Sequence, residues 1–144
     1  CVMAKLAVAD VDAVLFQTTL RVQVGDVNYG GHLANDAVLR LCHEVRMRWL
    51  AGLGWSETDA GGAGLIMADA AVQYLAQGFY GDELSAEMGV EDIGKGGFAL
   101  LFRLTRIADG KVLARARTGM VCFDYACQKV CRLPQALKTV LEVV

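Results

Sequence analysis

Apolar and polar positions alternate near the start of the chain. Between Val14 and Val24 the even positions are mostly apolar and the odd ones mostly polar, and this period of two predicts a strand with one buried face. Three glycines, Asp26 and Asn28 then break the pattern over Gly25–Gly31, so we expect this segment to form a loop.

A long helix is predicted next. Over Ala37–Leu53 the apolar residues recur at intervals of three and four, and they are so numerous that the helix must be largely enclosed. We expect Asn35 or Asp36 to cap its start, and Gly52 and Gly54 to end it.

The rest of the chain is predicted to form strands joined by tight turns. Asp109-Gly110 is a strong hairpin signal before the last strand, which we expect to bulge near Gly119. Pro134 then opens a short helix that reaches Leu141. The predicted strands are Leu65–Tyr74, Leu84–Val90, Phe98–Thr105 and Val112–Tyr125. One strand, a long helix and four further strands predict an α+β fold with an antiparallel sheet.

Length and composition narrow the possibilities. The 144 residues suit one domain over 1–144, in which residues 1–12 are expected to form an extended or disordered N-terminal segment. The 14 basic and 16 acidic residues nearly balance, which gives no support for a nucleic-acid or polybasic membrane surface. The hydrophobic fraction of 55% is high, so we expect some apolar surface to face another subunit.

Neither a membrane span nor a metal site is predicted. No stretch of about 18 uncharged apolar residues exists, and the first ten residues are too broken for a secretory signal. The five cysteines show no C-x-x-C pair, and the chain has two histidines, His32 and His43. Reduced, mostly buried thiols in a cytoplasmic protein are the expectation.

The segment Val24–Asp36, followed by Glu44–Leu50, resembles the 4-hydroxybenzoyl-CoA thioesterase branch of the hot-dog superfamily. Members of that family share an acidic loop before the long helix, often of the form D-x-D-x-x-G-H-x-x-N. Later segments are similar too, so the resemblance extends over nearly the whole chain from Val14. These segments are Gln73-Tyr74, Gly81-Asp82-Glu83, Asp124-Tyr125 and Leu133-Pro134.

The resemblance implies a fold, an activity and an assembly. The hot-dog fold wraps a curved antiparallel sheet of five to six strands around a long central helix. The implied activity is that of an acyl-CoA or acyl-ACP thioesterase, a homodimer or homotetramer with its site at the dimer interface. No metal or redox cofactor is implied, and coenzyme A takes part only as a portion of the substrate.

Asn28 departs from the family pattern. Aligned on Gly31-His32, the usual catalytic Asp falls on Asn28, and Asp26 takes the preceding acidic position. An amide cannot act as a carboxylate nucleophile or an ordinary general base. Some relatives, including plant acyl-ACP thioesterases, use Asn and His together in this loop. Asp26, Asn28 and His32 are therefore the candidate catalytic residues.

Thioester hydrolysis requires donors for the oxyanion, an activated water and a leaving thiolate. The N-terminus of the helix offers backbone donors, and Gly30 and Gly31 allow close approach of the substrate. Asp26 or His32 could activate the water, and Asn28 could orient the water or the carbonyl. Loop capping by Asp26, a structural His32 and a left-handed turn at Asn28 stay open as alternatives. The predicted substrate contacts are Tyr29, Gly30, Gly31, Leu33, Asn35 and Tyr74.

Other polar residues are weaker candidates. Glu44 is a further candidate for water activation, but we expect it to pair with Arg48 along the helix, and His43 is a weaker candidate still. The strand arginines could receive CoA phosphates, but a solvated outer face is the simpler interpretation. These arginines are Arg103, Arg106, Arg115 and Arg117.

Three other functions compete with the thioesterase. Asn28 favours a hot-dog protein that binds acyl thioesters without hydrolysing them. A hydratase or dehydratase of the same fold is disfavoured, because the proline-rich loop that follows a His in dehydratases is missing. A purely structural oligomeric module is the third alternative.

Overall fold

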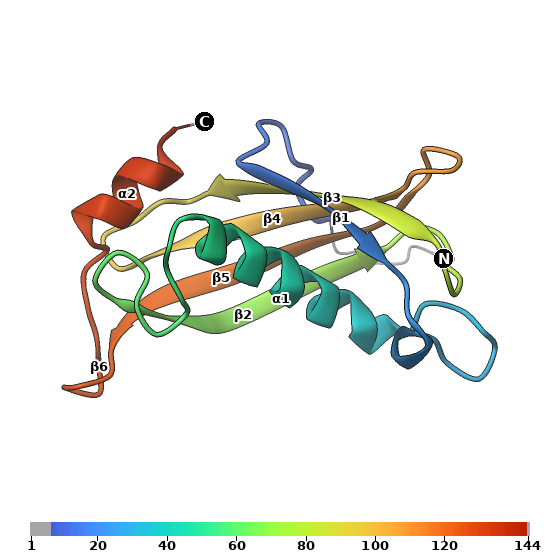
Figure 1. The fold of residues 1–144 in the computed structure, drawn as a ribbon. Helices are drawn as coiled ribbons and strands as arrows, with labels where there is room; N and C mark the ends of the chain where they lie inside the picture. The colour runs from blue at the N-terminus through green and yellow to red at the C-terminus, as the bar shows by residue number, and fades with distance from the viewer. Residues whose placement is uncertain (1–6, 144) are drawn as a thin grey trace, which may run out of the picture.

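A computed structural model describes residues 7–143, which form one antiparallel sheet with a long helix against it (Figure 1). The elements follow the predicted order, with a short strand, β6, that the sequence pattern did not indicate. Their bounds are β1 Phe16–Arg21, the 3-10 turn η1 Val24–Asp26, α1 Asn35–Gly52, β2 Gly64–Tyr74, β3 Glu83–Glu91, β4 Gly97–Arg106, β5 Val112–Asp124, β6 Lys129–Val130 and α2 Gln135–Leu141.

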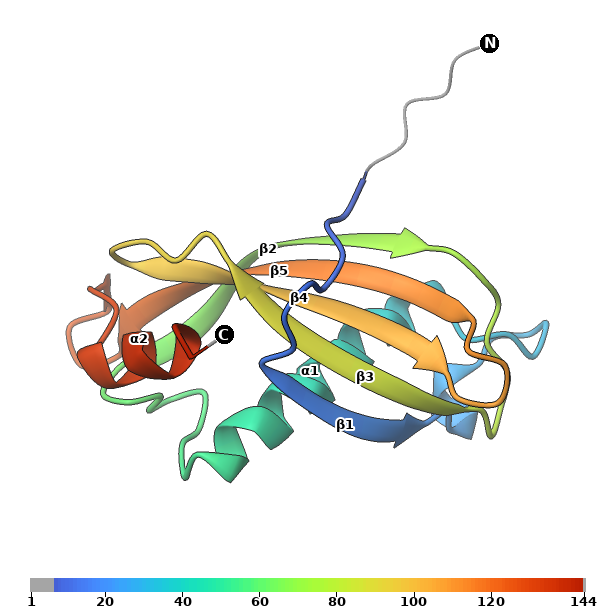
Figure 2. The same cartoon turned by 90° about the horizontal axis from the view of Figure 1, so that it is seen from above.

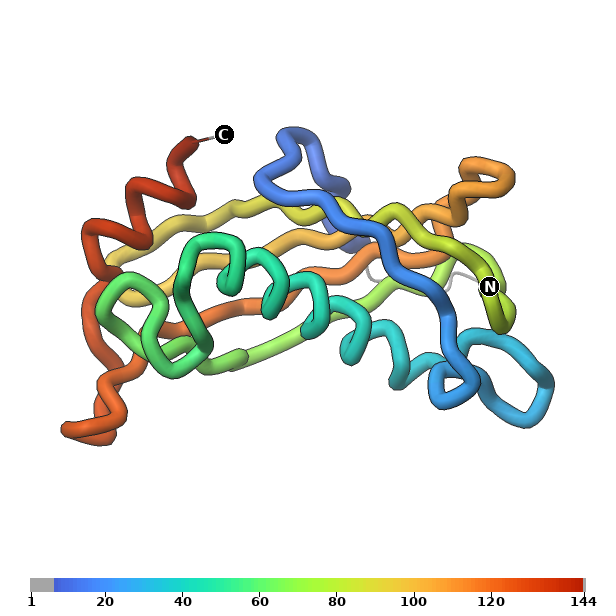
Figure 3. The backbone as a smooth tube through the Cα atoms, in the orientation of Figure 1, coloured from blue at the N-terminus to red at the C-terminus, as the bar shows by residue number. Residues whose placement is uncertain are grey.

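The sheet curves around α1. Its strands lie in the order β1-β3-β4-β5-β2, with all neighbours antiparallel, and β6 pairs with the end of β5. The helix lies along the concave side (Figures 2 and 3). Alternate strand residues such as Met88 and Phe102 pack with the helix stripe that includes Val38 and Val45, and all four are buried. A long helix wrapped by a curved antiparallel sheet is the predicted architecture, and the prediction is confirmed.

The first strand is shorter than predicted. β1 covers six residues within the predicted Val14–Val24. Val14 precedes the strand and is 39% exposed, while Val24 lies in η1 and is 76% exposed. Val22 is buried although it follows the last residue of β1. The alternation of buried and exposed residues therefore extends beyond the strand, which made the predicted strand too long.

The predicted cap of α1 is also wrong. Ala34 occupies the N-cap position, and it has no side chain that can bind the first N–H groups of the helix. Asn35 and Asp36 are the first helical residues, and the Asp36 carboxylate binds Arg40 one turn along at 2.8 Å. The hydrogen bond and the positive charge of Arg40 lower the pKa of Asp36. The N-cap residue therefore provides no side-chain hydrogen bond to the backbone N–H groups at the start of the helix.

The bulge that was predicted near Gly119 of β5 lies instead in the neighbouring strand β2, opposite Gly119. β2 carries one extra residue, Ala68, between Met67 and Asp69, and Asp69 is the register partner of Gly119. The Asp69 carboxylate accepts a hydrogen bond from the Gly119 N–H at 3.1 Å. A Cβ at position 119 would overlap this carboxylate, so a larger residue there would displace the Asp69 side chain and remove this hydrogen bond.

Residues 7–12 of the N-terminal segment lie on the convex face of the sheet, on the side away from α1 (Figure 2). Val8 and Val11 are buried, and Asp10 pairs with Arg103 at 2.9 Å and with Arg115 at 3.4 Å. The described part of the predicted N-terminal segment is thus held against the sheet, whereas residues 1–6 lie outside the described residues. Over 7–143, no helix has the length and apolar character needed to cross a membrane.

An arginine buried on α1 ties the helix to the loop that follows it. The side chain of Arg46 is 8% exposed, and its Nε donates to Glu57 Oε2 at 2.8 Å. The other carboxylate oxygen lies 2.7 Å from His43 Nε2. Burial raises the pKa of Glu57, but the hydrogen bonds from His43 and Arg46 outweigh burial and lower the pKa below its ordinary 4.5. The carboxylate is therefore bound more tightly than the protonated acid.

Glu57→Gln is expected to destabilise the fold by about 2 kcal/mol at neutral pH, because it leaves a buried guanidinium without its counter-charge. For a domain of this size the melting temperature should fall by about 5–10 °C. Since the pKa of Glu57 is lower in the folded state, its contribution is present above the ordinary value of 4.5 and is lost as the pH falls through the folded pKa. The difference between variant and wild type should therefore shrink below that pH.

Thermal unfolding across a pH series measures this prediction. Glu44→Gln is the matched control, because Glu44 pairs with Arg48 at 2.8 Å on the same helix but both side chains are about half exposed. That exposed pair should contribute only about 0.3–0.5 kcal/mol. Equal losses in the two variants would contradict the assignment of Glu57 as a structural anchor.

Candidate active site

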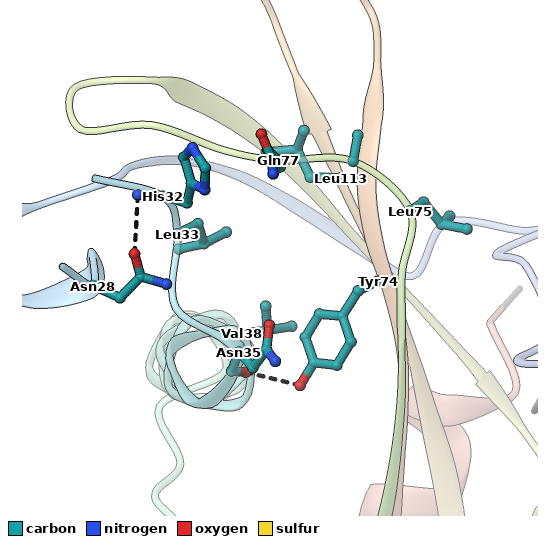
Figure 4. Close-up of a pocket in the computed structure, with 10 residues that line it drawn as sticks. Asn28, His32, Leu33, Asn35, Val38, Tyr74, Leu75, Gln77 and Leu113 are labelled. Carbon is teal, nitrogen blue, oxygen red and sulfur yellow. Dashed lines mark hydrogen bonds between the residues drawn. The ribbon is translucent and has the colours of Figure 1, made fainter. Parts of the chain in front are cut away.

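A pocket opens where α1 begins. Its volume is about 330 Å³, and it lies between the loop that precedes the helix, the end of β2 and the start of β5 (Figure 4). Its lining combines polar and apolar side chains from the loop, the helix and the strands. The lining residues are Asn28, His32, Leu33, Asn35, Val38, Tyr74, Leu75, Ala76, Gln77 and Leu113.

Backbone hydrogen bonds give the loop before α1 a defined shape. The N–H of Asn28 donates to the carbonyl of His32 at 2.9 Å, and the N–H of Gly31 donates to the carbonyl of Asn28 at 2.9 Å. Gly31 has a φ of +77°, in the left-handed region that favours glycine. The N–H of Leu33 donates to Gly78 at 2.7 Å, which fixes the loop to the segment after β2.

The side chain of Asn28 is oriented by two backbone donors. Its Oδ1 accepts hydrogen bonds from the N–H of Gly30 at 3.0 Å and from the N–H of His32 at 3.3 Å. Because both partners are donors, the oxygen of the amide must face them. The amide nitrogen then points away from them, toward the side on which α1 begins (Figure 4). Asn28 therefore presents two N–H donors to the pocket.

His32 is half-buried at the wall of the pocket. Its ring meets the ring of Phe79 edge to face, with 5.2 Å between centroids and 83° between planes. The two residues also form an isolated antiparallel bridge. No carboxylate is among the lining residues of this pocket in the described chain, so His32 is the lining side chain that can act as a general base.

The open start of α1 forms another part of the wall. Asn35 is the first helical residue, and the backbone N–H groups of the first turn have no side-chain cap. The hydroxyl of Tyr74 donates to the carbonyl of Asn35 at 2.9 Å, which ties the end of β2 to this turn. Free N–H groups and the positive end of the helix dipole both favour an anion at this position.

The structure brings together some of the predicted site residues but not others. Asn28, His32, Leu33, Asn35 and Tyr74 line the pocket. The remaining four predicted residues, Asp26, Tyr29, Gly30 and Gly31, do not line it, and the side chain of Tyr29 is fully exposed.

Asp26 is used in the loop itself. Its carboxylate accepts a hydrogen bond from the N–H of Gln23 at 2.9 Å, and it borders a separate hollow beside β1 together with Arg40 and Glu44. The carbonyl of Asp26 accepts the N–H of Ala34 at 2.7 Å. This is the loop-capping alternative that the sequence left open.

The segment after β2 supplies residues that the sequence did not indicate. Leu75, Ala76 and Gln77 line the pocket although they follow the end of the strand. The available signal was Gly78, since it is buried and an added Cβ there would press on Leu33 and Leu113. A glycine that ends an apolar run can mark such a close approach of two chain segments.

The weaker candidates have other partners. Glu44 pairs with Arg48, as predicted. The four strand arginines pair with carboxylates, so each positive charge already has a counter-charge. These pairs include Arg103 with Glu87 and Asp10, Arg106 with Asp82 and Asp109, Arg115 with Asp10, and Arg117 with Asp92.

Comparison with known protein families identifies the class of protein to which this fold and pocket belong. The family model of the thioesterase-like superfamily matches residues 22–141. The chain therefore belongs to this superfamily, and its reaction class is thioester hydrolysis.

Individual relatives agree with this assignment. The chain is 26% identical over 132 residues to a 1,4-dihydroxy-2-naphthoyl-CoA hydrolase of Synechococcus elongatus, covering 89% of this chain and 94% of the relative. The crystal structure of a 1,4-dihydroxy-2-naphthoyl-CoA thioesterase from Synechocystis superposes with a TM-score of 0.80 at 23% identity, covering 90% of this chain and 96% of the other. The Staphylococcus aureus protein SAV2348, solved in complex with CoA, superposes with a TM-score of 0.79 at 17% identity, covering 94% and 85%. The predicted hot-dog resemblance is confirmed.

Proposed function

We propose that this protein hydrolyses an acyl-CoA, or the corresponding acyl-carrier-protein thioester, in the pocket at the start of α1. The observation that carries the proposal is the meeting of three groups in one pocket: the amide donors of Asn28, the imidazole of His32 and the uncapped first turn of the helix. Hydrogen-bond donors and a proton acceptor around one partly apolar cavity are what acyl transfer to water requires.

In the proposed reaction, water attacks the thioester carbonyl while His32 takes up one of its protons. The oxygen of the resulting tetrahedral intermediate receives hydrogen bonds from the Asn28 amide and from the backbone N–H of Asn35. The C–S bond then breaks, the sulfur leaves with the electron pair, and the imidazolium of His32 gives the proton to the thiolate. The products are a carboxylic acid and a free thiol.

The acyl group is proposed to lie against the apolar part of the lining. Leu33, Val38 and Leu113 provide this surface, and Tyr74 and Gln77 add polar atoms at its border. Two of the relatives named above are by name hydrolases of 1,4-dihydroxy-2-naphthoyl-CoA, an aromatic acyl-CoA, which makes aromatic acyl groups the first to try. Reduced cysteines and a CoA substrate suit a cytoplasmic enzyme.

Release of free thiol from a panel of aromatic, short and long acyl-CoA compounds tests the function. Turnover of any member supports it. Thermal stabilisation by CoA with no turnover across the panel would favour the alternative, a protein that binds acyl thioesters without hydrolysing them, for which Asn28 in place of the usual Asp is the motivating observation.

The free edge of β2 is proposed to pair with the same edge of a second copy. β2 borders the sheet, and its central residues Ile66, Met67 and Ala70 are exposed. An exposed apolar edge of this length is a template for pairing with another strand. Tyr74 lies at the end of the same strand and lines the pocket, so the pairing would set the pocket beside the interface between two copies.

Lysine at Met67 and Ala70 should therefore block dimerisation, because charge on an edge strand opposes pairing. Sedimentation velocity is expected to change from dimer to monomer, with a loss of thiol release. Ile107→Lys is the matched control, because Ile107 is an equally exposed apolar residue outside the β2 edge. A double variant that sediments like the wild type would exclude this edge as the interface.

A further inference from the structure

Arg106, the last residue of β4, makes four hydrogen bonds although it lies outside the pocket. Its Nε and one terminal nitrogen bind the two oxygens of Asp109 at 3.1 and 3.0 Å. The other terminal nitrogen donates to the carbonyl of Gln77 at 2.9 Å and to Asp82 Oδ2 at 3.1 Å. Hydrogen bonds to Asp109 and Asp82 raise the pKa of Arg106, so the guanidinium stays charged.

Arg106 and Asp82 together hold the segment that runs from Gln77 to Asp82. Asp82 Oδ2 accepts the N–H of Phe79 at 2.9 Å, in addition to the bond from Arg106. The carbonyl of Asp82 accepts the N–H of Val22 at 2.9 Å, which fixes the segment to the chain just before η1. The ion pair between Arg106 and Asp82 thus holds both ends of this segment, since Arg106 also binds the carbonyl of Gln77.

The same segment contacts the proposed proton acceptor. The ring of Phe79 packs edge to face against the ring of His32, and the two residues form a backbone bridge. The neighbouring carbonyl, that of Gly78, accepts the N–H of Leu33. Figure 4 shows His32 and Gln77 on the same border of the pocket. A shift of the segment would therefore turn or release the imidazole.

We propose that Arg106 and Asp82 are positioning residues that hold Phe79 against His32 and so fix the imidazole in the pocket. The inference rests on the proposed function of His32 as the proton acceptor. Neither Arg106 nor Asp82 lines the pocket, so neither is proposed to touch the substrate. A displacement of about 1 Å at a reacting group can reduce a rate by about 100-fold.

Three substitutions separate positioning from general stability. Arg106→Gln removes the charge, and Arg106→Lys keeps a charge that can reach the carbonyl of Gln77 or Asp82. Asp109→Asn is the control, because Asp109 binds Arg106 and has no hydrogen bond to the segment from Gln77 to Asp82. For Arg106→Gln we expect kcat to fall by about 10- to 100-fold with KM nearly unchanged, and Arg106→Lys to recover part of the loss.

A second measurement does not depend on turnover. With two histidines in the chain, NMR of histidine-labelled protein contains two sets of ring signals, and His43→Gln assigns them. We expect Arg106→Gln to shift and broaden the His32 signal while the His43 signal stays in place, and Asp109→Asn to leave the His32 signal close to that of the wild type. A His32 signal that is unchanged in folded Arg106→Gln would overturn the proposal.

The two hypotheses fail in different ways. A wild type without thiol release on any substrate would remove the proposed function, while the His32 signal would still report whether Arg106 holds the ring. Turnover in the wild type with an equal loss of kcat in Arg106→Gln and Asp109→Asn, in proportion to their melting temperatures, would leave Arg106 as a stabilising residue and overturn its positioning role.

Discussion

Replacing His32 with alanine is expected to reduce kcat/KM for thioester hydrolysis by about 100- to 10,000-fold, the usual contribution of a general base. The physical reason is that none of the described residues that line the pocket is a carboxylate that could take over the proton. Water would still reach the carbonyl, and the Asn28 amide would still bind the oxyanion, so a residual rate is expected. The measurement is the rate of thiol release at a saturating substrate concentration, which gives kcat, and at a low concentration, which gives kcat/KM.

His43→Ala is the matched control for this experiment. His43 is the second histidine of the chain, lies on α1 and binds Glu57 well outside the pocket lining. This variant should lose some stability and little activity per folded molecule. Near-normal activity in folded His32→Ala would show that the proton goes elsewhere, and the mechanism proposed for this pocket would have to be abandoned.

Asn28→Asp is expected to lower kcat by about 100- to 1,000-fold, the loss found when an oxyanion donor is removed. The new carboxylate has the same shape and can still accept the N–H groups of Gly30 and His32. Its second oxygen, however, would replace two N–H donors with a negative charge beside the developing oxyanion. The variant therefore changes the chemistry of the pocket while keeping the loop hydrogen bonds.

The opposite result is equally informative. In the family pattern the position of Asn28 is held by an Asp, so an increase in activity would mean that this loop works best with a carboxylate and that Asn28 is a weakened version of it. The control for an intact pocket is the binding of CoA to the variant, measured as an increase in its melting temperature. A substitution that abolishes both binding and turnover would point to damage of the loop and away from a donor role.

Most of the lining residues that are close in sequence were predicted from the sequence, whereas Tyr74 is the one predicted residue among those that the sheet brings to the pocket. Asn28, His32, Leu33 and Asn35 lie within eight positions, so one loop and one helix start carry them together. Gln77 enters through the bridge between His32 and Phe79, which depends on the order of the strands. Periodicity reports which face of a strand is buried but not which loop the strand end will meet.

The role of Asp26 shows a different limit of sequence reasoning. Aspartate in a loop can act on water or bind backbone N–H groups, and the residue type is the same in both cases. Here the carboxylate accepts a hydrogen bond from the N–H of Gln23 and lies outside the pocket lining, which favours the loop-capping role. Ala34 at the N-cap is a similar case, because the sequence pattern for a helix start depends on a capping side chain and alanine has none. The first turn of α1 is therefore left without a side-chain cap beside the pocket.

The bulge at Ala68 makes the wall of the pocket tolerant of losing a residue and intolerant of gaining one. Met67 before the bulge and Tyr74 after it both lie opposite buried residues of β5, Met120 and Ala114, because the bulge absorbs one position. A deletion at Ala68 would restore plain alternation and leave Tyr74 facing the helix. An insertion in the same strand would turn Tyr74 to the convex face and separate it from Asn35. Over evolutionary time, this strand is therefore expected to shorten more readily than it lengthens.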